Sequence, residues 1–246
     1  MRFDFWEKLV VGLLALALLY SYREDLLFGP IARRVVREQQ RKAGHLQSAR
    51  MRLAAEDAAR FVDEHMASLQ QSADRYALFK VSLAAVKING LHCEFGVAGG
   101  TTLNHLSAQR PGWTWHGFDS FEGLPEDWRN GFARGTFATD GLPRMNRNVI
   151  LHKGWFDKTV PEFHAATTEP IAFAHMDADL YSSTKTVLES LADRIVPGTV
   201  LQFDEFLGYP GWRNGEYKAF TEFVEAHHMR YRFLGYAIQQ VAVVFE

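Results

Sequence analysis

Four carboxylate side chains occur as two closely spaced pairs, and their spacing suggests chemistry. Asp177 and Asp179 lie in "HMDADLYSSTK", and Asp204 and Glu205 lie in "FDEF". Each pair closes an apolar run that we expect to be a strand, and the ends of parallel strands meet at one sheet edge, where ligands bind. Carboxylates this close raise one another's pKa unless a cation neutralises them, and hard oxygen ligands suit magnesium or calcium. The sequence therefore predicts a divalent cation at this edge.

The alternative interpretation of each pair is structural. The acids would be solvated residues that cap helices beginning near Ser182 and Glu216. Such caps explain either pair singly much better than both pairs together. The neighbouring His175 has no metal-ligand spacing and is expected to be structural.

A glycine-rich stretch, "EFGVAGGTT" at residues 94 to 102, follows the first expected strand. Glycines allow a ligand to approach the backbone, and the next helix presents free amide groups. Asp119, in "FDSFEGLP", follows about twenty residues later, where an acid can accept hydrogen bonds from both hydroxyls of a ribose. Together they indicate an adenosine-containing ligand. The alternatives are a packing turn for the glycines and a helix or turn cap for Asp119.

Seven extended runs would position these residues, with helical patterns between most of them. Strands alternating with helices predict an α/β fold with a mostly parallel sheet covered on both faces. The last two runs are separated only by Ile238, so we expect an antiparallel hairpin at the sheet edge. The expected strands cover residues 91–97, 114–121, 148–156, 171–180, 198–206, 230–237 and 239–246.

The segment from Glu122 to Arg147 lacks clear periodicity and carries Trp128, Phe132 and Phe137 among glycines and prolines. Loops this long are usually functional or disordered. The aromatic content and the position over the strand ends favour a lid on a substrate pocket. The "GYPGW" stretch at 208–212 is expected either to shape the acceptor pocket or to form a rigid turn.

The amino end contains an apolar run of 14 uncharged residues, Leu9 to Tyr22. As a helix it would rise roughly 21 Å, short of a hydrocarbon core of about 30 Å. We expect residues 1–28 to be an apolar segment that either anchors the chain to a membrane or packs on protein. Basic residues are more numerous after the run, so an inserted segment would leave the protein on the cytoplasmic face. Residues 29–89 are expected to form helices, the second over 75–87, and residues 90–246 the sheet domain.

Composition and charge limit the class of protein. With 246 residues, 47% hydrophobic positions and a net charge of -2, the chain can bury one substantial core and has no overall attraction for nucleic acid. Its single cysteine, Cys93, can form no internal disulfide and is expected to be a buried thiol. These features are typical of a cytoplasmic protein.

Five stretches in this order resemble the macrocin O-methyltransferase family of sugar-modifying, class I S-adenosylmethionine-dependent enzymes. They are "EFGVAGG", "DSFEGLP", "KGWF", "DADLYSST" and "FDEF", and the resemblance covers roughly residues 76 to 246. It implies a Rossmann-like methyltransferase sheet of seven strands with a reversed last strand, preceded by N-terminal helices. It also implies S-adenosylmethionine as cofactor, with magnesium as a second one.

The resemblance assigns roles to individual residues. Asp179 matches the family's proposed general base, and Asp177, Asp204 and Glu205 match its magnesium ligands. Glu205 is a departure, because better-known members carry aspartate there. The implied cofactor-binding residues are Glu94, Gly96, Gly99 and Gly100 for the methionine part, Asp119 for the ribose, and Gly154 and Trp155 for the adenine, together with Ser120 beside Asp119.

The leading hypothesis is an enzyme that methylates a hydroxyl of a small-molecule acceptor, a sugar or natural-product-like compound. One competing class is a membrane-tethered binding or scaffold protein that keeps the fold without transfer activity. Another is a nicotinamide-dependent oxidoreductase, which Ala98 disfavours because it replaces a fingerprint glycine. Expected partners are the acceptor, a membrane through residues 9–22, and a second copy of the chain, with no nucleic acid.

Overall fold

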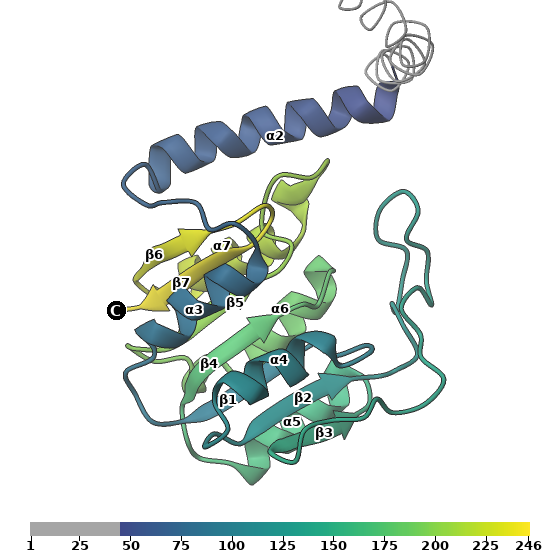
Figure 1. Ribbon diagram of the computed structural model, residues 1–246, viewed down its shortest axis with the longest axis vertical. Coiled ribbons are helices and arrows are strands. Elements are labelled where there is room, and N and C mark those ends of the chain that lie inside the picture. The colour runs from purple at the N-terminus through teal and green to yellow at the C-terminus, as the bar shows by residue number, and fades with distance from the viewer. Residues whose placement is uncertain (1–44) are drawn as a thin grey trace, which may run out of the picture. The chain divides into compact units, whose positions relative to one another are not determined.

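The computed structural model describes residues 45–246, and a seven-stranded sheet is its central element (Figure 1). The strand order is β3-β2-β1-β4-β5-β7-β6. The strands β1 to β5 pair in parallel, whereas β7 is antiparallel to both β5 and β6. The predicted parallel sheet with a reversed last strand is therefore confirmed, as is the closing hairpin.

All seven predicted strands form, but each is shorter than its apolar run. Their bounds are β1 Leu91–Phe95, β2 Trp115–Asp119, β3 Val149–Lys153, β4 Ile171–Met176, β5 Val200–Phe203, β6 Tyr231–Tyr236 and β7 Val241–Phe245. The strands β4 and β5 end before their acids, so the two acid pairs lie in the loops that follow. Backbone bonds still connect these loops to the sheet: Asp177 N donates to Phe95 O at 2.9 Å, and Asp204 N donates to Met176 O at 2.9 Å.

Helices cover both faces of the sheet. Their bounds are α2 Leu46–His65, α3 Arg75–Ala85, α4 Thr101–Gln109, α5 Phe156–Ala166, α6 Tyr181–Ser190 and α7 Glu216–Ala226, with short 3-10 turns at Ala192–Arg194 and Trp212–Asn214. Figure 1 shows α3 and α4 on one face and α5, α6 and α7 on the other. Separate apolar clusters fill the two sides. Because every residue of β4 and β5 is buried, these strands form the centre of the core.

Local sequence explains where the helix that carries a site residue begins. Asp74 is the N-cap of α3, and its carboxylate accepts a hydrogen bond from the Ala77 amide at 2.8 Å. The helix therefore begins at Arg75, as predicted, and its end at Ala85 lies two residues before the predicted end. This start places Arg75 close to the carboxyl ends of the strands.

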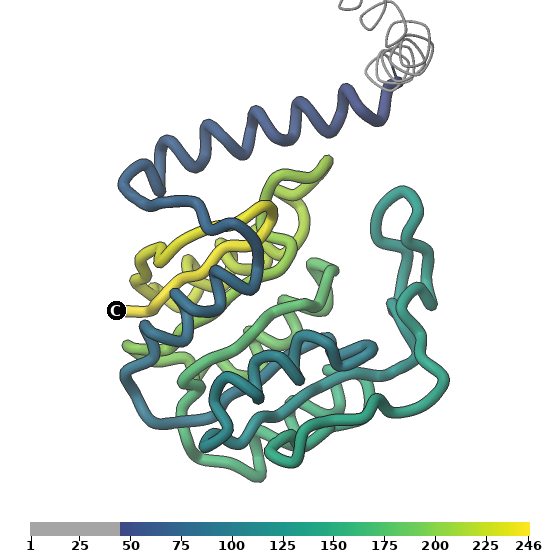
Figure 2. Tube along the Cα trace, in the orientation of Figure 1, coloured from purple at the N-terminus to yellow at the C-terminus, as the bar shows by residue number. Residues whose placement is uncertain are grey.

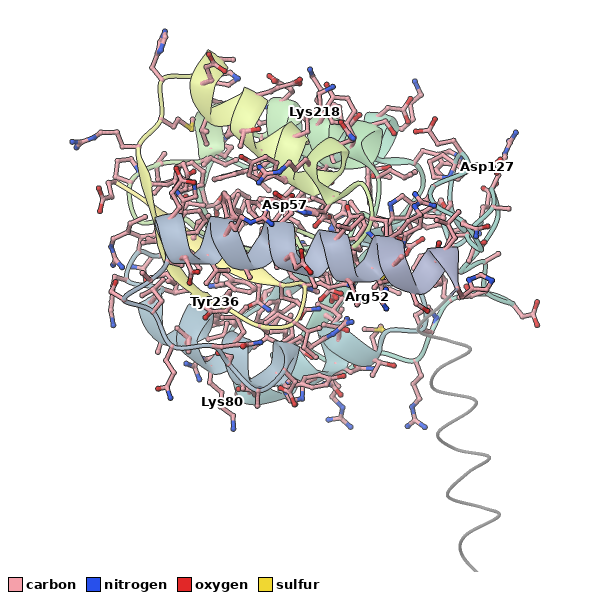
Figure 3. The ribbon with its side chains drawn as sticks, turned by 90° about the horizontal axis from the view of Figure 1, so that it is seen from above. Arg52, Asp57, Lys80, Asp127, Lys218 and Tyr236 are labelled. Carbon is pink, nitrogen blue, oxygen red and sulfur yellow. The ribbon has the colours of Figure 1, made fainter. Side chains whose placement is uncertain are left out.

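Residues Leu53–Glu246 form one compact unit, which contains the whole sheet. The part of α2 in this unit packs through Ala54, Ala58 and Phe61 into the core. Asp57, labelled in Figure 3, accepts two hydrogen bonds from Arg213, from Nε at 2.9 Å and from Nη2 at 3.0 Å. The second predicted helix, α3, belongs to the same unit as the sheet.

Cys93 is fully buried in β1, as predicted, and burial raises the pKa of its thiol. The apolar run at 9–22 lies outside the described residues, so its membrane role stays a prediction. Among the helices of residues 45–246, none combines the length and the hydropathy needed to cross a bilayer.

Candidate active site

A cavity of about 620 Å³ opens at the carboxyl ends of β1, β2, β4 and β5, where an α/β sheet binds its ligands. Most residues predicted for the site line it. They are Gly96, Gly99, Asp119, Ser120, Gly154 and Trp155 for the cofactor, together with Asp177, Asp179, Asp204 and Glu205. The fold thus brings predicted site residues from five separate stretches of the chain to one cavity.

The glycine turn forms one wall, and Gly96 is indispensable to it. Gly96 has φ +98°, and a Cβ atom at this position would lie 1.8 Å from the backbone oxygen of Asp177. The turn after β1 therefore packs directly against the loop that carries the first acid pair. At Gly99, by contrast, a Cβ atom would have no neighbouring atom within 4 Å, so the backbone there faces open space in the cavity.

Asp119 holds the same turn in place. Its Oδ2 atom accepts hydrogen bonds from the amides of Val97 and Ala98 at 2.8 and 2.7 Å, and Oδ1 accepts from Phe121 at 2.6 Å. Each carboxylate oxygen offers about two acceptor positions. One acceptor position on Oδ1 therefore remains for a ligand. The sequence predicts two, one for each ribose hydroxyl.

Two predicted cofactor-binding residues do not line the cavity. Glu94 is 1% exposed and lies within the sheet, where its Oε1 is 3.1 Å from Nδ1 of His175. Gly100, with φ +76°, is buried at the start of α4, and a Cβ there would meet Sδ of Met145 at 2.7 Å. Glu94 thus pairs with His175 inside the sheet, which agrees with the structural role expected of His175. The missing side chain at Gly100 leaves room for Met145, where the chain returns from the lid.

Three of the four acids form a tight group, which we call the acid notch: Asp177, Asp179 and Glu205. One carboxylate oxygen from each lies within 4.8 Å of the others, a spacing that one cation can bridge. Oε2 of Glu205 is buried and has no hydrogen-bond partner among the described residues. A buried carboxylate oxygen without a hydrogen-bond donor can be satisfied by a cation bound in the notch.

Asp204, predicted as a metal ligand, instead lies against Arg75. Its Oδ2 is 2.9 Å from Nη2 of Arg75, while Nη1 of the same guanidinium is 3.9 Å from Oδ2 of Asp177. On its other side, Oδ1 of Asp204 lies 3.5 Å from Nε2 of His175, too far for a full hydrogen bond. Sequence reasoning missed Arg75, because nothing local to residue 75 indicates a partner beyond the end of β5.

Burial and mutual repulsion dominate the electrostatics of the notch. Burial, reinforced by Asp204, raises the pKa values of Asp177 and Glu205 well above their ordinary values. Burial also raises the pKa of Asp179 to about 7, although Arg129 opposes the increase. Asp179 has φ +61°, a backbone strain that is rare outside glycine and common at functional sites.

The predicted lid leaves β2 and returns to β3 as an extended excursion (Figure 2). Trp128, Arg129, Phe132 and Phe137 from this segment line the cavity, which supports a lid role. The Arg129 guanidinium lies over the ring of Trp128 at 3.8 Å and over the ring of Tyr209 at 4.7 Å. Cation–π contacts therefore fasten the lid to the loop after β5.

Tyr209 belongs to the "GYPGW" stretch, for which both a pocket-shaping and a turn role were open. It is 2% exposed and does not line the cavity itself. Its ring makes a cation–π contact with the Arg129 guanidinium. A second fastening runs from Ser182 at the start of α6, whose hydroxyl donates to Oε1 of Glu126 in the lid at 2.6 Å.

Comparison with known proteins places this arrangement in a family context. Residues 132–245 match the family model described as macrocin-O-methyltransferase (TylF), a range that includes "KGWF", "DADLYSST" and "FDEF". The resemblance predicted from the motifs is confirmed over this part of the chain. A curated relative from Streptomyces olivaceus, 8-demethyl-8-(2,3-dimethoxy-alpha-L-rhamnosyl)-tetracenomycin-C 4'-O-methyltransferase, is 31% identical over 109 residues, which are 36% of this chain. The match spans 40% of the length of that relative.

Solved structures show a similar fold over a larger share of the chain. The calicheamicin methyltransferase CalS11 superposes with a TM-score of 0.56 at 25% identity, covering 70% of this chain and 80% of that chain. The O-methyltransferase NovP superposes with a TM-score of 0.53 at 20% identity, covering 69% and 79%. The fold is therefore that of the class I methyltransferases.

Proposed function

We propose that this protein is an S-adenosylmethionine-dependent O-methyltransferase that acts on a hydroxyl of a small molecule. One observation carries the proposal: a single cavity joins the glycine turn after β1 to the acid notch after β4 and β5. The first feature suits an adenosine-containing donor, and the second suits deprotonation of an acceptor. The family match and the named methyltransferases of similar fold support the same chemistry.

The donor would lie along the wall formed by Gly96, Gly99 and Asp119. The remaining acceptor position on Oδ1 of Asp119 is available to a ribose hydroxyl. Gly154 and Trp155, at the start of α5, line the same cavity and would border the adenine.

The residues present fit a divalent cation, and we assign Asp177 and Glu205 as its ligands. Their oxygens belong to one compact set, and Oε2 of Glu205 has no other partner in the described part of the chain. Magnesium at this position would supply Lewis acidity that lowers the pKa of an acceptor hydroxyl. Asp204 lies outside this set, and its Oδ2 pairs with Arg75.

Asp179 is our candidate for the general base. Its carboxylate lines the cavity beside the proposed cation ligands, where it can accept a proton from an acceptor hydroxyl bound there. The reaction needs little covalent catalysis, since the sulfonium already makes the methyl group electrophilic. As the acceptor oxygen bonds to the methyl carbon and the carbon–sulfur bond breaks, Asp179 takes the hydroxyl proton. Alignment of donor and acceptor supplies most of the remaining rate enhancement.

The lid defines the acceptor side of the cavity. Rings of Trp128, Phe132 and Phe137 offer apolar faces, while Ser182 and Ser183 at the start of α6 offer hydroxyls. Such a lining suits an acceptor with both an apolar face and hydroxyl groups, such as a sugar carried on a natural product. The curated relative, named for methylation of a rhamnosyl compound, supports this choice.

Calorimetry tests the proposal and separates the competing classes. The full-length protein is titrated with S-adenosylmethionine and with NAD, each with and without magnesium. We expect binding of S-adenosylmethionine and no binding of NAD. Preferential NAD binding would indicate an oxidoreductase. S-adenosylmethionine binding without methyl transfer to any acceptor in a cell extract would indicate the scaffold alternative.

A further inference from the structure

A buried acid beneath the notch contacts both acid-bearing loops. Glu216, the first residue of α7, is 0% exposed. Its Oε2 accepts a hydrogen bond from the Glu205 amide at 3.0 Å. Its Oε1 accepts from the Ala178 amide at 3.3 Å and from the Thr184 hydroxyl at 3.4 Å. One side chain therefore joins the loop after β4, the loop after β5 and helix α6.

None of the hydrogen-bond donors to Glu216 among the described residues carries a positive charge. The three groups that donate to it are neutral: two backbone N–H groups and one hydroxyl. Its own position at the first turn of α7 places it near the positive end of the helix dipole, which favours an acid there. A buried group with such specific partners is expensive to keep, and its contacts specify a unique geometry.

The two amides that Glu216 binds have significant positions. Glu205 is a member of the acid notch, and Ala178 lies between the other two members, Asp177 and Asp179. Fixing both amides to one carboxylate fixes the separation of the two loops. The distance between the notch carboxylates depends on that separation.

We propose that Glu216 is a positioning residue that sets the spacing of the acid notch from beneath. The effect of Glu216 on cation binding rests on the proposed function and its cation site. The hydrogen bonds of Glu216 to the two loops do not depend on either. Glu216 does not line the cavity, so it touches neither donor nor acceptor. Glutamine at this position keeps the shape but presents an NH₂ group toward one of the two loop amides, so one loop loses its acceptor.

The test compares Glu216→Gln with Glu222→Gln in the full-length protein. Glu222 lies on the same helix and accepts hydrogen bonds from Tyr181 at 2.6 Å and Lys185 at 3.0 Å, without contacting either loop. Calorimetry measures Mn²⁺ and S-adenosylmethionine affinities for each variant. We expect Glu216→Gln to weaken Mn²⁺ binding tenfold or more and to change S-adenosylmethionine affinity less than twofold. Glu222→Gln should leave both affinities unchanged.

Amide hydrogen exchange keeps the two proposals distinguishable. Exchange at Ala178 or Glu205 should accelerate at least tenfold in Glu216→Gln relative to wild type, with other sheet amides unchanged. If wild type binds no Mn²⁺, the proposed cation site is refuted, and the exchange result alone decides the role of Glu216. Unchanged exchange at both amides, or equal losses of Mn²⁺ and S-adenosylmethionine affinity, would overturn the inference.

Discussion

Nη2 of Arg75 lies 2.9 Å from Oδ2 of Asp204, so the first residue of α3 neutralises an acid at the end of β5. Asp204 is 1% exposed, whereas Arg75 is 34% exposed. The guanidinium thus reaches the site from the opposite face of the sheet to α7. The pair holds the Arg75 guanidinium beside the acid notch, where its Nη1 lies 3.9 Å from Oδ2 of Asp177.

Replacing Arg75 by glutamine should have two opposite effects. Loss of Arg75 leaves the buried carboxylate of Asp204 without its counter-charge. We expect this to lower the free energy of unfolding by about 1–3 kcal/mol. The decrease is smaller than for a fully buried ion pair, because Arg75 is partly exposed. Affinity for Mn²⁺ should rise, since a competing cation has been removed. Chemical denaturation and calorimetry measure the two quantities. Lys80→Gln, at an exposed position of α3 (Figure 3), is the matched control. Weaker Mn²⁺ binding in Arg75→Gln would contradict this assignment.

The two glycines of the turn after β1 should respond very differently to alanine. A Cβ at Gly96 would lie 1.8 Å from the Asp177 carbonyl oxygen and would require a left-handed backbone, so Gly96→Ala should cost about 3 kcal/mol or more of stability. Gly99→Ala meets no neighbouring atom and should keep the wild-type melting temperature. It should nevertheless reduce S-adenosylmethionine affinity, because the added methyl group enters the cavity. Equal melting temperatures for both variants would show that the turn is packed differently.

Tyr209 offers a matched pair of substitutions for the lid. Tyr209→Phe keeps the ring beneath Arg129, whereas Tyr209→Leu removes a cation–π contact of about 0.5–2 kcal/mol. The hydroxyl is buried without a hydrogen-bond partner in the described residues, so its removal should be neutral or stabilising. Limited proteolysis within residues 122–147 should therefore accelerate only in Tyr209→Leu. Identical cleavage rates would argue that Arg129 does not fasten the lid.

A buried histidine outside the site should make stability depend on pH. His92 is 9% exposed and stacks on Trp113 with ring centroids 3.9 Å apart. Burial lowers its pKa to about 4 from an ordinary 6.5, although a contact with the Thr114 carbonyl opposes this. The unfolded chain therefore takes up a proton first as the pH falls, and stability is lost between about pH 6.5 and pH 4. His92 alone should contribute about 2–3 kcal/mol to this loss. Denaturation curves of wild type and His92→Gln at about pH 7 and about pH 4.5 measure the difference, and an unchanged pH dependence would refute the contribution.

The strand alternation and acid spacing of the sequence were sufficient to predict the sheet and most of the cavity lining. Asp177 and Glu205 follow fully buried strands of a parallel sheet, so their place at the carboxyl edge follows from topology. Glu94 shows where this reasoning fails. In a strand buried on both faces, alternation cannot distinguish an acid that faces a ligand from one that pairs with a histidine.

Long-range partners account for the residues that sequence reasoning missed. Arg75 and Glu216 each act on loops that are distant in sequence, and their own surroundings resemble ordinary helix starts. Only the packing of α3 and α7 against opposite sides of the site reveals their contacts. Asp204 illustrates the same limit, because the Arg75 partner of its carboxylate is distant in sequence and was not predicted.

The most direct test of the central claim uses Asp179→Asn with S-adenosylmethionine labelled in its methyl group. Wild-type protein and variant are incubated with a small-molecule extract, and labelled products are separated and counted, with donor affinity measured in parallel. We expect wild type to label a hydroxyl-bearing compound, and Asp179→Asn to lose at least a thousandfold of this rate with donor affinity within twofold of wild type. Equal labelling by the variant, or an absence of labelling by wild type in every extract tested, would contradict the proposed reaction.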